Sequence, residues 1–124
     1  MKITCGTDII EVDRIEKAIN TTEGFKTRIF TEKEIEYCEK SEKTQYQHFA
    51  GRFSAKEAVY KAISNNMSKD YTFNWKDVEI TNEENGRPII TLGSQLSNNI
   101  ESIDLTISHI KEYATANCVV TWRE

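Results

Sequence analysis

The sequence predicts an α+β protein, with its helices mainly in the first half and packed on a small, mostly antiparallel sheet. Three observations support this class. Between residues 12 and 63, apolar side chains recur every three or four positions, as in amphipathic helices. Between residues 78 and 122, apolar and polar side chains alternate, as in half-buried strands. Asn85-Gly86 lies between two of these alternating segments, and this dipeptide favours a β-hairpin.

The first half is expected to contain one strand followed by helices. Residues 2–8 alternate between apolar and polar side chains and are expected to form the strand. Helical spacing begins near residue 13, and residues 25–29 are expected to add another helical turn or two. The tetrapeptide TEKE at 31–34 is a capping box, which predicts the start of a further helix. After a polar break, helical spacing resumes from residue 45 to about residue 63.

The second half is expected to contain a loop followed by strands. The expected elements are a loop at 64–72, a strand at 78–81, its hairpin partner at 89–92, a short helix at 95–100, and strands at 105–109 and 114–122 joined by a turn. The many strands of this half, set against the helices of the first, are typical of the α+β class rather than of a parallel α/β sheet.

Composition limits the partners and the compartment. The chain has 124 residues, which fits one domain, and 16 Lys and Arg against 20 Asp and Glu give a net charge of −4. Nucleic-acid binding is not expected, because it depends on clustered cations. The three cysteines have no CxxC spacing, so we expect reduced, packed cysteines in a cytoplasmic protein. No segment approaches the roughly 20 apolar residues of a membrane span, and no membrane attachment is expected.

The stretch FSAKEAVYKAI at 53–63 carries Glu57 and Lys61 about one helical turn apart. The two side chains share a face opposite a core face of alanine, valine and isoleucine. An ordinary surface ion pair, worth about 0.3–0.5 kcal/mol, is the local alternative to a functional site. Phe53 and Tyr60 lie on the same face. Because exposed aromatic side chains are unfavourable in water, this face is expected to be covered by a partner or a ligand. Small residues along this helix would also let another backbone approach closely.

Two further polar residues lie at the ends of predicted strands. Asp8 follows the first strand and a glycine, in a place where many functional sites are built. A helix N-cap or a turn residue is the local alternative for Asp8. His109 ends a later strand, and its local alternative is a structural histidine with satisfied hydrogen bonds. The local sequence leaves both alternatives open.

Five segments combine these residues. They are GTDIIEVDRI at 6–15, FTEKE at 30–34, FAGRFSAKEAVYKA at 49–62, NGRP at 85–88 and ISHIKEYATA at 107–116. In order and spacing they resemble the holo-acyl-carrier-protein synthases, the small phosphopantetheinyl transferases, nearly end to end. The combination is specific, although each segment alone is weak. The resemblance implies a single phosphopantetheinyl transferase-like domain over residues 1–124.

The resemblance also implies a reaction. Members of this family transfer the 4′-phosphopantetheine group of coenzyme A to a serine of apo acyl carrier protein, and the product supports fatty-acid biosynthesis. The reaction requires Mg²⁺ and releases adenosine 3′,5′-bisphosphate. A homotrimer is implied as well, with coenzyme A in a cleft between neighbouring protomers.

The same resemblance assigns roles to individual residues. Asp8 and Glu57 match the family's metal carboxylates, and Mg²⁺ prefers a few carboxylates together with substrate oxygens and water. Lys61 matches the active-site lysine and is expected to bind the diphosphate and to stabilise or protonate the departing phosphate. His109 is expected beside the coenzyme A phosphates, and Arg52 is a further candidate phosphate contact. Either Glu57 or a metal-bound water is expected to take the serine proton.

The nucleotide and the carrier protein are expected at two other places. Gly86, Arg87 and Pro88 would border the adenine end of coenzyme A. Relatives often carry a glycine-rich run where this chain has residues 63–68, so no contact is assigned there. The acidic carrier is expected to dock against the first helical region. Candidate contacts are Arg14, Lys17, Ile19, Phe25, Lys26 and Arg28. Scattered surface cations are the local alternative, and acidic neighbours dilute this patch, so apolar contacts would carry part of the docking.

A non-catalytic trimeric module that binds a nucleotide or a carrier protein is the alternative function. Such a module would keep the core pattern without needing Asp8, Glu57 and Lys61 together. The joint presence of these three residues favours the enzyme.

Overall fold

A long central helix, a three-stranded sheet and a separate hairpin make up the structure, which confirms the α+β class. The computed structural model describes all of residues 1–124. Its elements are β1 (Lys2–Glu11), α1 (Val12–Thr21), α2 (Phe25–Ile29), α3 (Glu32–Glu39), α4 (Gln45–Ile63), η1 (Ser64–Asn66), η2 (Trp75–Asp77), β2 (Val78–Asn82), β3 (Pro88–Leu92), β4 (Ile100–His109) and β5 (Tyr113–Trp122). None of the helices has the length and apolar character needed to cross a bilayer.

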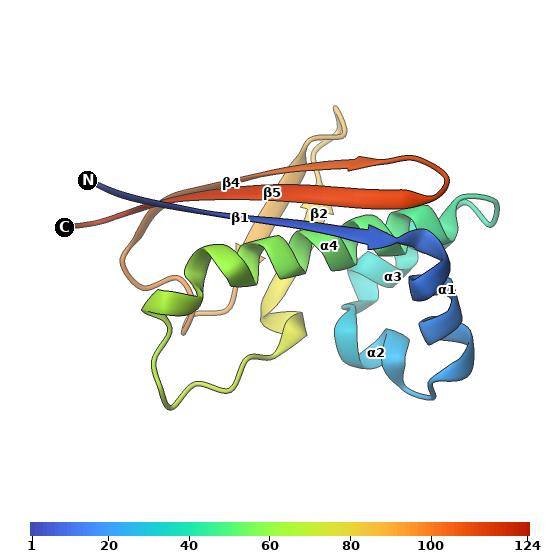
Figure 1. Ribbon diagram of the computed structural model, residues 1–124, viewed down its shortest axis with the longest axis horizontal. Helices are drawn as coiled ribbons and strands as arrows, with labels where there is room; N and C mark the ends of the chain where they lie inside the picture. Colours follow the sequence, from blue (N-terminus) through green and yellow to red (C-terminus); the bar gives the residue numbers. More distant parts are fainter.

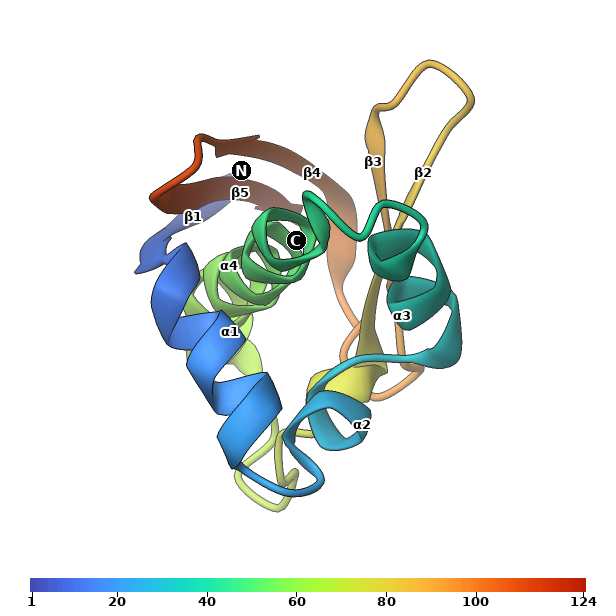
Figure 2. The same cartoon turned by 90° about the vertical axis from the view of Figure 1, so that its right-hand side faces the viewer.

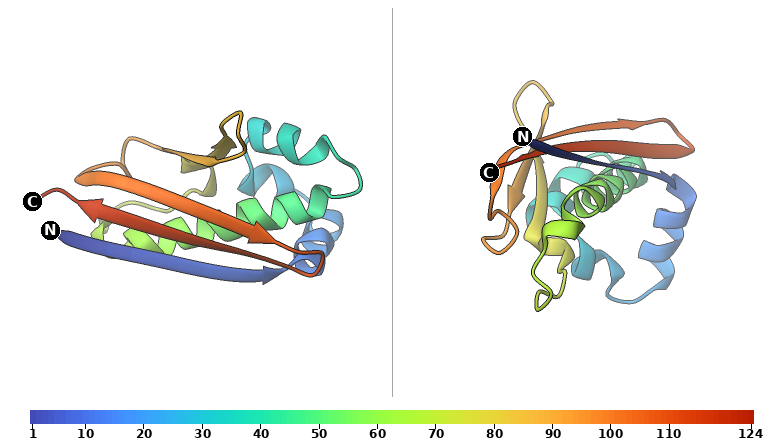
Figure 3. Two further views of the ribbon diagram at one scale, coloured as in Figure 1. Left: turned by 90° about the horizontal axis from the view of Figure 1, so that it is seen from above. Right: turned by 60° about the vertical axis from the view of Figure 1, so that its left-hand side comes forward.

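The three-stranded sheet is antiparallel, with the strand order β1-β5-β4. Helix α4 runs along one face of this sheet, and the two chain termini lie together at one end (Figure 1). Seen along α4, the sheet, the β2–β3 hairpin and helices α1 to α3 surround the central helix (Figure 2). The view from above shows β1, β5 and β4 side by side, with nothing covering the sheet face that points away from α4 (Figure 3).

Helix α4 is buried along most of its length, and β1 crosses it at very short range. A Cβ added to Gly6 would lie 2.0 Å from the carbonyl oxygen of Ala58 and 2.8 Å from the amide nitrogen of Ala62. The expectation that small residues of this helix let another backbone approach is therefore confirmed. Because side chains alternate along a strand, Asp8 lies on the same face of β1 as Gly6 and also points toward α4.

A fully buried ion pair joins α3 to α4. The Nζ of Lys56 lies 2.8 Å from Oε1 of Glu34, and both side chains are 0% exposed. Lys56 Nζ also donates to the carbonyl oxygens of Trp75 (3.0 Å) and Val78 (2.6 Å). Glu34 Oε2 accepts from the amide of Ile80 at 2.8 Å. The sequence did not predict this network, because a lysine in a helix usually faces solvent.

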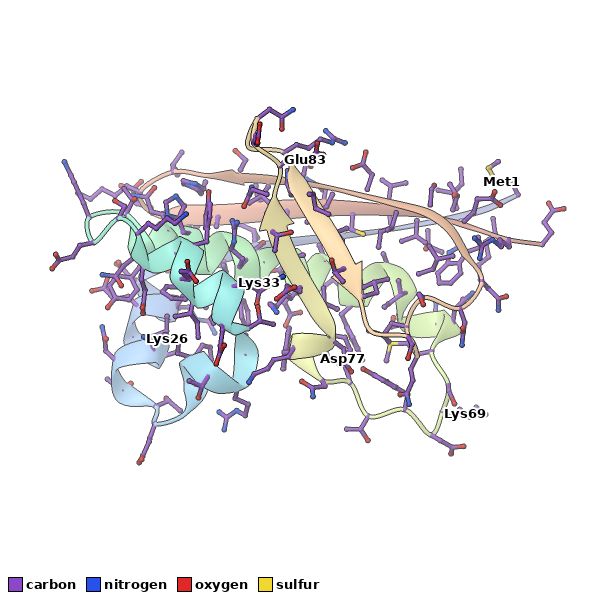
Figure 4. The ribbon with its side chains drawn as sticks, turned by 180° about the vertical axis from the view of Figure 1, so that it is seen from behind. Met1, Lys26, Lys33, Lys69, Asp77 and Glu83 are labelled. Atoms are coloured by element: carbon purple, nitrogen blue, oxygen red, sulfur yellow. The ribbon has the colours of Figure 1, made fainter.

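The predicted capping box is confirmed. The hydroxyl of Thr31 accepts from the amide of Glu34, and the Glu34 carboxylate accepts from the amide of Thr31 at 2.8 Å. The predicted hairpin is also present, with Gly86 in the left-handed region at φ 91°. Figure 4 shows Glu83 at its tip and Asp77 at its base.

Two sequence predictions need correction. The first strand extends to Glu11 rather than ending at residue 8, so Asp8 lies inside β1 and is not a helix N-cap. The short helix predicted at 95–100 is wrong. That segment forms separate turns, in which Leu96 bonds back to Gly93 and Ile100 to Ser97. Serine and asparagine, which dominate the segment, favour such turns over helix interiors.

Candidate active site

Strand β1 and helix α4 bring Asp8, Glu57 and Lys61 together. The Nζ of Lys61 lies 3.3 Å from Oδ1 of Asp8 and donates to the carbonyl oxygen of Thr7 at 3.0 Å. Lys61 therefore pairs across the β1–α4 contact with Asp8. The ordinary surface pair between Glu57 and Lys61, which was the local alternative, is not among the ion pairs of the structure.

The backbone of Asp8 is fixed by two hydroxyl groups. Its carbonyl oxygen accepts from Oγ of Ser54 at 3.1 Å and from Oγ1 of Thr115 at 2.8 Å. Ser54 is buried in α4 and Thr115 lies on β5, so the neighbouring helix and strand both hold Asp8 in place. The sequence prediction gave neither residue a role, although both lie inside the segments 49–62 and 107–116, because a hydroxyl side chain within a motif carries no signal of its own.

The environment of Glu57 fits a cation. Burial raises the pKa of Glu57, the charge of Asp8 raises it further, and Lys61 opposes the shift. The charge of Asp8 thus disfavours ionisation of Glu57, and a divalent cation bound by both carboxylates would relieve that repulsion. No cluster of three or more His, Cys, Asp or Glu side chains that could hold a metal ion occurs in the structure. A two-carboxylate set is what Mg²⁺ accepts when substrate oxygens and water complete its shell.

The raised pKa of Glu57 predicts how stability depends on pH without a divalent cation. The folded state keeps the Glu57 proton to a higher pH than the unfolded state does. Stability therefore falls as the pH rises from the unfolded pKa through the folded pKa. Glu57→Gln cannot ionise, so above that interval it is expected to be more stable than the wild type. Urea midpoints measured in chelator across the acid-to-neutral range check this, and equal midpoints at neutral pH would contradict it.

Phe53 and Tyr60 lie one turn to either side of Glu57 on α4, and Phe73 and Trp75 pack on them. We call these four aromatic side chains the aromatic wall. The Trp75 ring stacks on Phe53 at 5.4 Å, and Phe73 meets Tyr60 edge-on at 4.8 Å. Phe73 and Trp75 also contact each other at 5.2 Å. Part of the cover expected over the Glu57 face of α4 thus comes from the chain's own segment before β2.

His109 and Arg52 lie apart from the carboxylates, beside the first turns of α4. The Nδ1 of His109 lies 3.0 Å from Oε1 of Gln47, and its ring is 5.5 Å from the His48 ring. Glu57 comes nine residues after His48, or about 14 Å along the helix. Within one chain, the predicted site residues therefore form two groups rather than one.

Arg52 is only 4% exposed. Its guanidinium lies 4.0 Å from the centre of the Tyr37 ring and bonds the side chain of Asn82 at the end of β2. Its Nε is buried without a hydrogen-bond partner. Arg52 therefore links α4 to the hairpin in this conformation, and a phosphate would have to displace part of these contacts to reach it.

Comparisons with known proteins identify the family of the chain. The family model of the 4′-phosphopantetheinyl transferase superfamily matches residues 4–118. The chain belongs to this superfamily. The holo-[acyl-carrier-protein] synthase of Thermoanaerobacter sp. (strain X514) is 43% identical over 119 residues, which cover 92% of this chain and 83% of that protein.

Two solved structures that resemble this chain contain coenzyme A or part of it. The holo-(acyl-carrier-protein) synthase from Bacillus anthracis str. Ames, in complex with CoA (3′,5′-ADP), is 34% identical with a TM-score of 0.78, over 98% of this chain and 96% of that one. The Helicobacter pylori holo-[acyl-carrier-protein] synthase in complex with coenzyme A is 31% identical with a TM-score of 0.80, over 94% and 99%. The family and the fold predicted from the five segments are confirmed.

The tip of the β2–β3 hairpin is held by contacts within the hairpin and to β4. Nδ2 of Asn82 donates to the carbonyl oxygen of Gly86 at 2.8 Å. The Arg87 guanidinium reaches both carboxylate oxygens of Asp104 on β4 at 2.7 Å. Pro88 begins β3 directly after the turn. The three residues expected near adenine thus lie together, but the charge of Arg87 is already paired.

The predicted carrier-docking residues lie along α1 and α2. Arg14, Lys17 and Arg28 are exposed, and Ile19 is half-buried. Lys26 pairs with Glu39 at 2.5 Å, so part of its charge is already compensated. Phe25 lies 6.3 Å from Phe53, which connects this surface to the aromatic wall beside Glu57.

Proposed function

We propose that this chain, as one domain over residues 1–124, transfers the 4′-phosphopantetheine group of coenzyme A to a serine of apo acyl carrier protein. Adenosine 3′,5′-bisphosphate is the second product, and the holo carrier serves fatty-acid biosynthesis in the cytoplasm. The convergence of Asp8, Glu57 and Lys61 from two separate elements carries the proposal. The names of the relatives and the coenzyme A in similar structures support it.

Mg²⁺ is the proposed cofactor, held by Asp8 and Glu57. When bound, it would neutralise the charge of the diphosphate and of the departing phosphate. Lys61 is 49% exposed although it contacts Asp8, so its ammonium can turn toward a bound diphosphate without losing burial. The acidic carrier is proposed to dock on α1 and α2, where the exposed Arg14, Lys17 and Arg28 lie and where Phe25 leads to the aromatic wall.

We also propose a homotrimer with coenzyme A at the boundary between protomers. The sheet face away from α4 is uncovered and carries the exposed side chains Ile3, Ile9, Tyr113 and Val119, which another copy would bury. A boundary site would unite the group around Asp8 of one protomer with the group around His109 of another.

Mixed assemblies test the shared site. Asp8→Ala and His109→Ala are each expected to be inactive alone, because each lacks one half of every site. After the two proteins are unfolded and refolded together, a measurable part of the activity is expected to return, since some sites then combine two intact halves. A mixture that stays inactive, although sedimentation shows mixed trimers, would contradict the shared site.

Lys61→Met is expected to lower kcat about 100-fold, because the variant loses a positioned cation at the reacting phosphate. The KM for coenzyme A should change less, since the metal and the nucleotide contacts remain. Steady-state kinetics with apo carrier measures both constants. Lys69→Met is the matched control, because Lys69 is exposed in the loop after α4 (Figure 4). A wild-type kcat in Lys61→Met would remove Lys61 from the mechanism.

A mass-shift assay tests the function itself. The protein is incubated with coenzyme A, Mg²⁺ and apo acyl carrier protein, and the carrier is weighed by mass spectrometry. Its mass is expected to rise by one phosphopantetheine group. Binding of carrier and coenzyme A without any mass change would favour the non-catalytic trimeric module.

A further inference from the structure

We infer that Lys56, the residue before Glu57, is a positioning residue that fastens the aromatic wall beside the active site. The inference rests on the proposed function, because it concerns how the chain holds its donor. Lys56 does not contact the reacting groups. It acts through Trp75, whose backbone it binds and whose ring forms part of the wall.

All three N–H groups of the Lys56 ammonium have partners. They are the carboxylate of Glu34 and the carbonyl oxygens of Trp75 and Val78. These carbonyls belong to residues at the two ends of the short segment that leads from the loop after α4 into β2. Because Lys56 is 0% exposed, this segment cannot leave α4 without exposing or unpairing a buried charge.

The fastened segment supplies Trp75 to the aromatic wall, and Phe73 lies two residues before it. The Trp75 ring stacks on Phe53, and Phe73, two residues earlier, packs on Tyr60. Phe53 and Tyr60 lie one turn to either side of Glu57 on α4. The side chains of the wall carry no charge, so they suit the uncharged pantetheine arm that extends from a diphosphate bound at Asp8, Glu57 and Lys61.

The inference predicts a specific kinetic change. The wall contacts the donor but no reacting atom, so its loss should weaken the ground state and the transition state equally. In Lys56→Met, the KM for coenzyme A is expected to rise tenfold or more while kcat falls less than threefold. A general loss of folded protein would lower the apparent kcat and leave KM unchanged.

Tryptophan fluorescence gives a readout that does not depend on activity. The chain has two tryptophans. In a Trp122→Phe background, Trp75 is the only tryptophan that fluoresces. Acrylamide quenching of Trp75 is expected to at least double when Lys56→Met is added, because the segment is no longer held. Leu105→Ala is the control, since it truncates a buried side chain of β4 and leaves the three Lys56 contacts in place.

A second variant keeps the test decisive if Lys56→Met fails to fold. Glu34→Gln/Lys56→Met leaves no unpaired buried charge and also lacks the tether. Wild-type quenching together with a wild-type KM in either folded variant would overturn the inference. A rise in Trp75 quenching in Leu105→Ala as large as that in Lys56→Met would also overturn it. If the parent protein transfers nothing, the proposed function fails, whereas the quenching experiment still decides whether Lys56 holds the wall.

Discussion

Replacing Asp8 by Asn, or Glu57 by Gln, is expected to lower the rate of phosphopantetheine transfer by about 10²–10³-fold. Each amide keeps the size of the side chain but removes a negative charge from the proposed cation site. Phosphoryl transfer depends mainly on positioning and on charge neutralisation, so this loss acts directly on the rate. The rate of holo-carrier formation, followed by mass over a range of Mg²⁺ concentrations, measures the effect.

A cation-binding readout separates this effect from misfolding. Mg²⁺ is expected to raise the melting temperature of the wild type, because a ligand that binds only the folded state stabilises it. The shift should be absent in Asp8→Asn and in Glu57→Gln. Glu101→Gln, an exposed carboxylate on β4, is the matched control and should behave like the wild type. A wild-type rate and a wild-type Mg²⁺ shift in either active-site variant would remove it from the cation site.

The elements that sequence predicted well are those with a local cause. The capping box at Thr31 and Glu34 needs only residues within one turn, and the strands of the second half follow from alternation. The segment 95–100 was assigned wrongly because its few apolar side chains fit a helical spacing by chance. Its serine and asparagine residues instead form turns, and one of them, Asn99, has a φ of 66°.

The sequence did not predict which polar side chains are buried. Lys56 and Lys61 lie in the same helix with similar neighbours, yet Lys56 is 0% exposed and Lys61 is 49% exposed. The difference comes from α3 and β2, which pack over one side of α4 and supply partners from positions 22 or more residues away. No periodicity within α4 contains that information.

The candidate site was predicted from five sequence segments taken together, and no single local pattern predicted it. Asp8, Glu57 and Lys61 each had an ordinary local alternative, and only the five segments together suggested one site. The structure adds the reason for their convergence, because β1 lies against α4 at Gly6 and so carries Asp8 to Lys61. It also places His109 beside His48 and Arg52 against Tyr37, so these two residues do not join the other three within one chain.

Gly6→Ala is therefore expected to damage both stability and activity. The new Cβ would lie 2.0 Å from the carbonyl oxygen of Ala58, and a backbone atom inside a helix cannot turn aside as a side chain can. We expect a loss of about 3 kcal/mol or more in the free energy of unfolding, at the upper end of overpacking costs. Since β1 must move away from α4, Asp8 moves as well, and a shift of about 1 Å at a reacting centre costs roughly 100-fold in rate.

Gly51→Ala provides the matched control within α4 itself. Its added Cβ would meet only Cγ2 of Ile107 at 3.2 Å, so a shift of a few tenths of an ångström in one side chain relieves the contact. Alanine also favours a helix interior by up to about 1 kcal/mol over glycine. Urea unfolding and transfer kinetics are expected to show near-wild-type behaviour for Gly51→Ala and a large loss of both for Gly6→Ala. If Gly6→Ala matched Gly51→Ala in both measurements, β1 would not lie against α4 at this range, and the placement of Asp8 beside Lys61 would lose its structural cause.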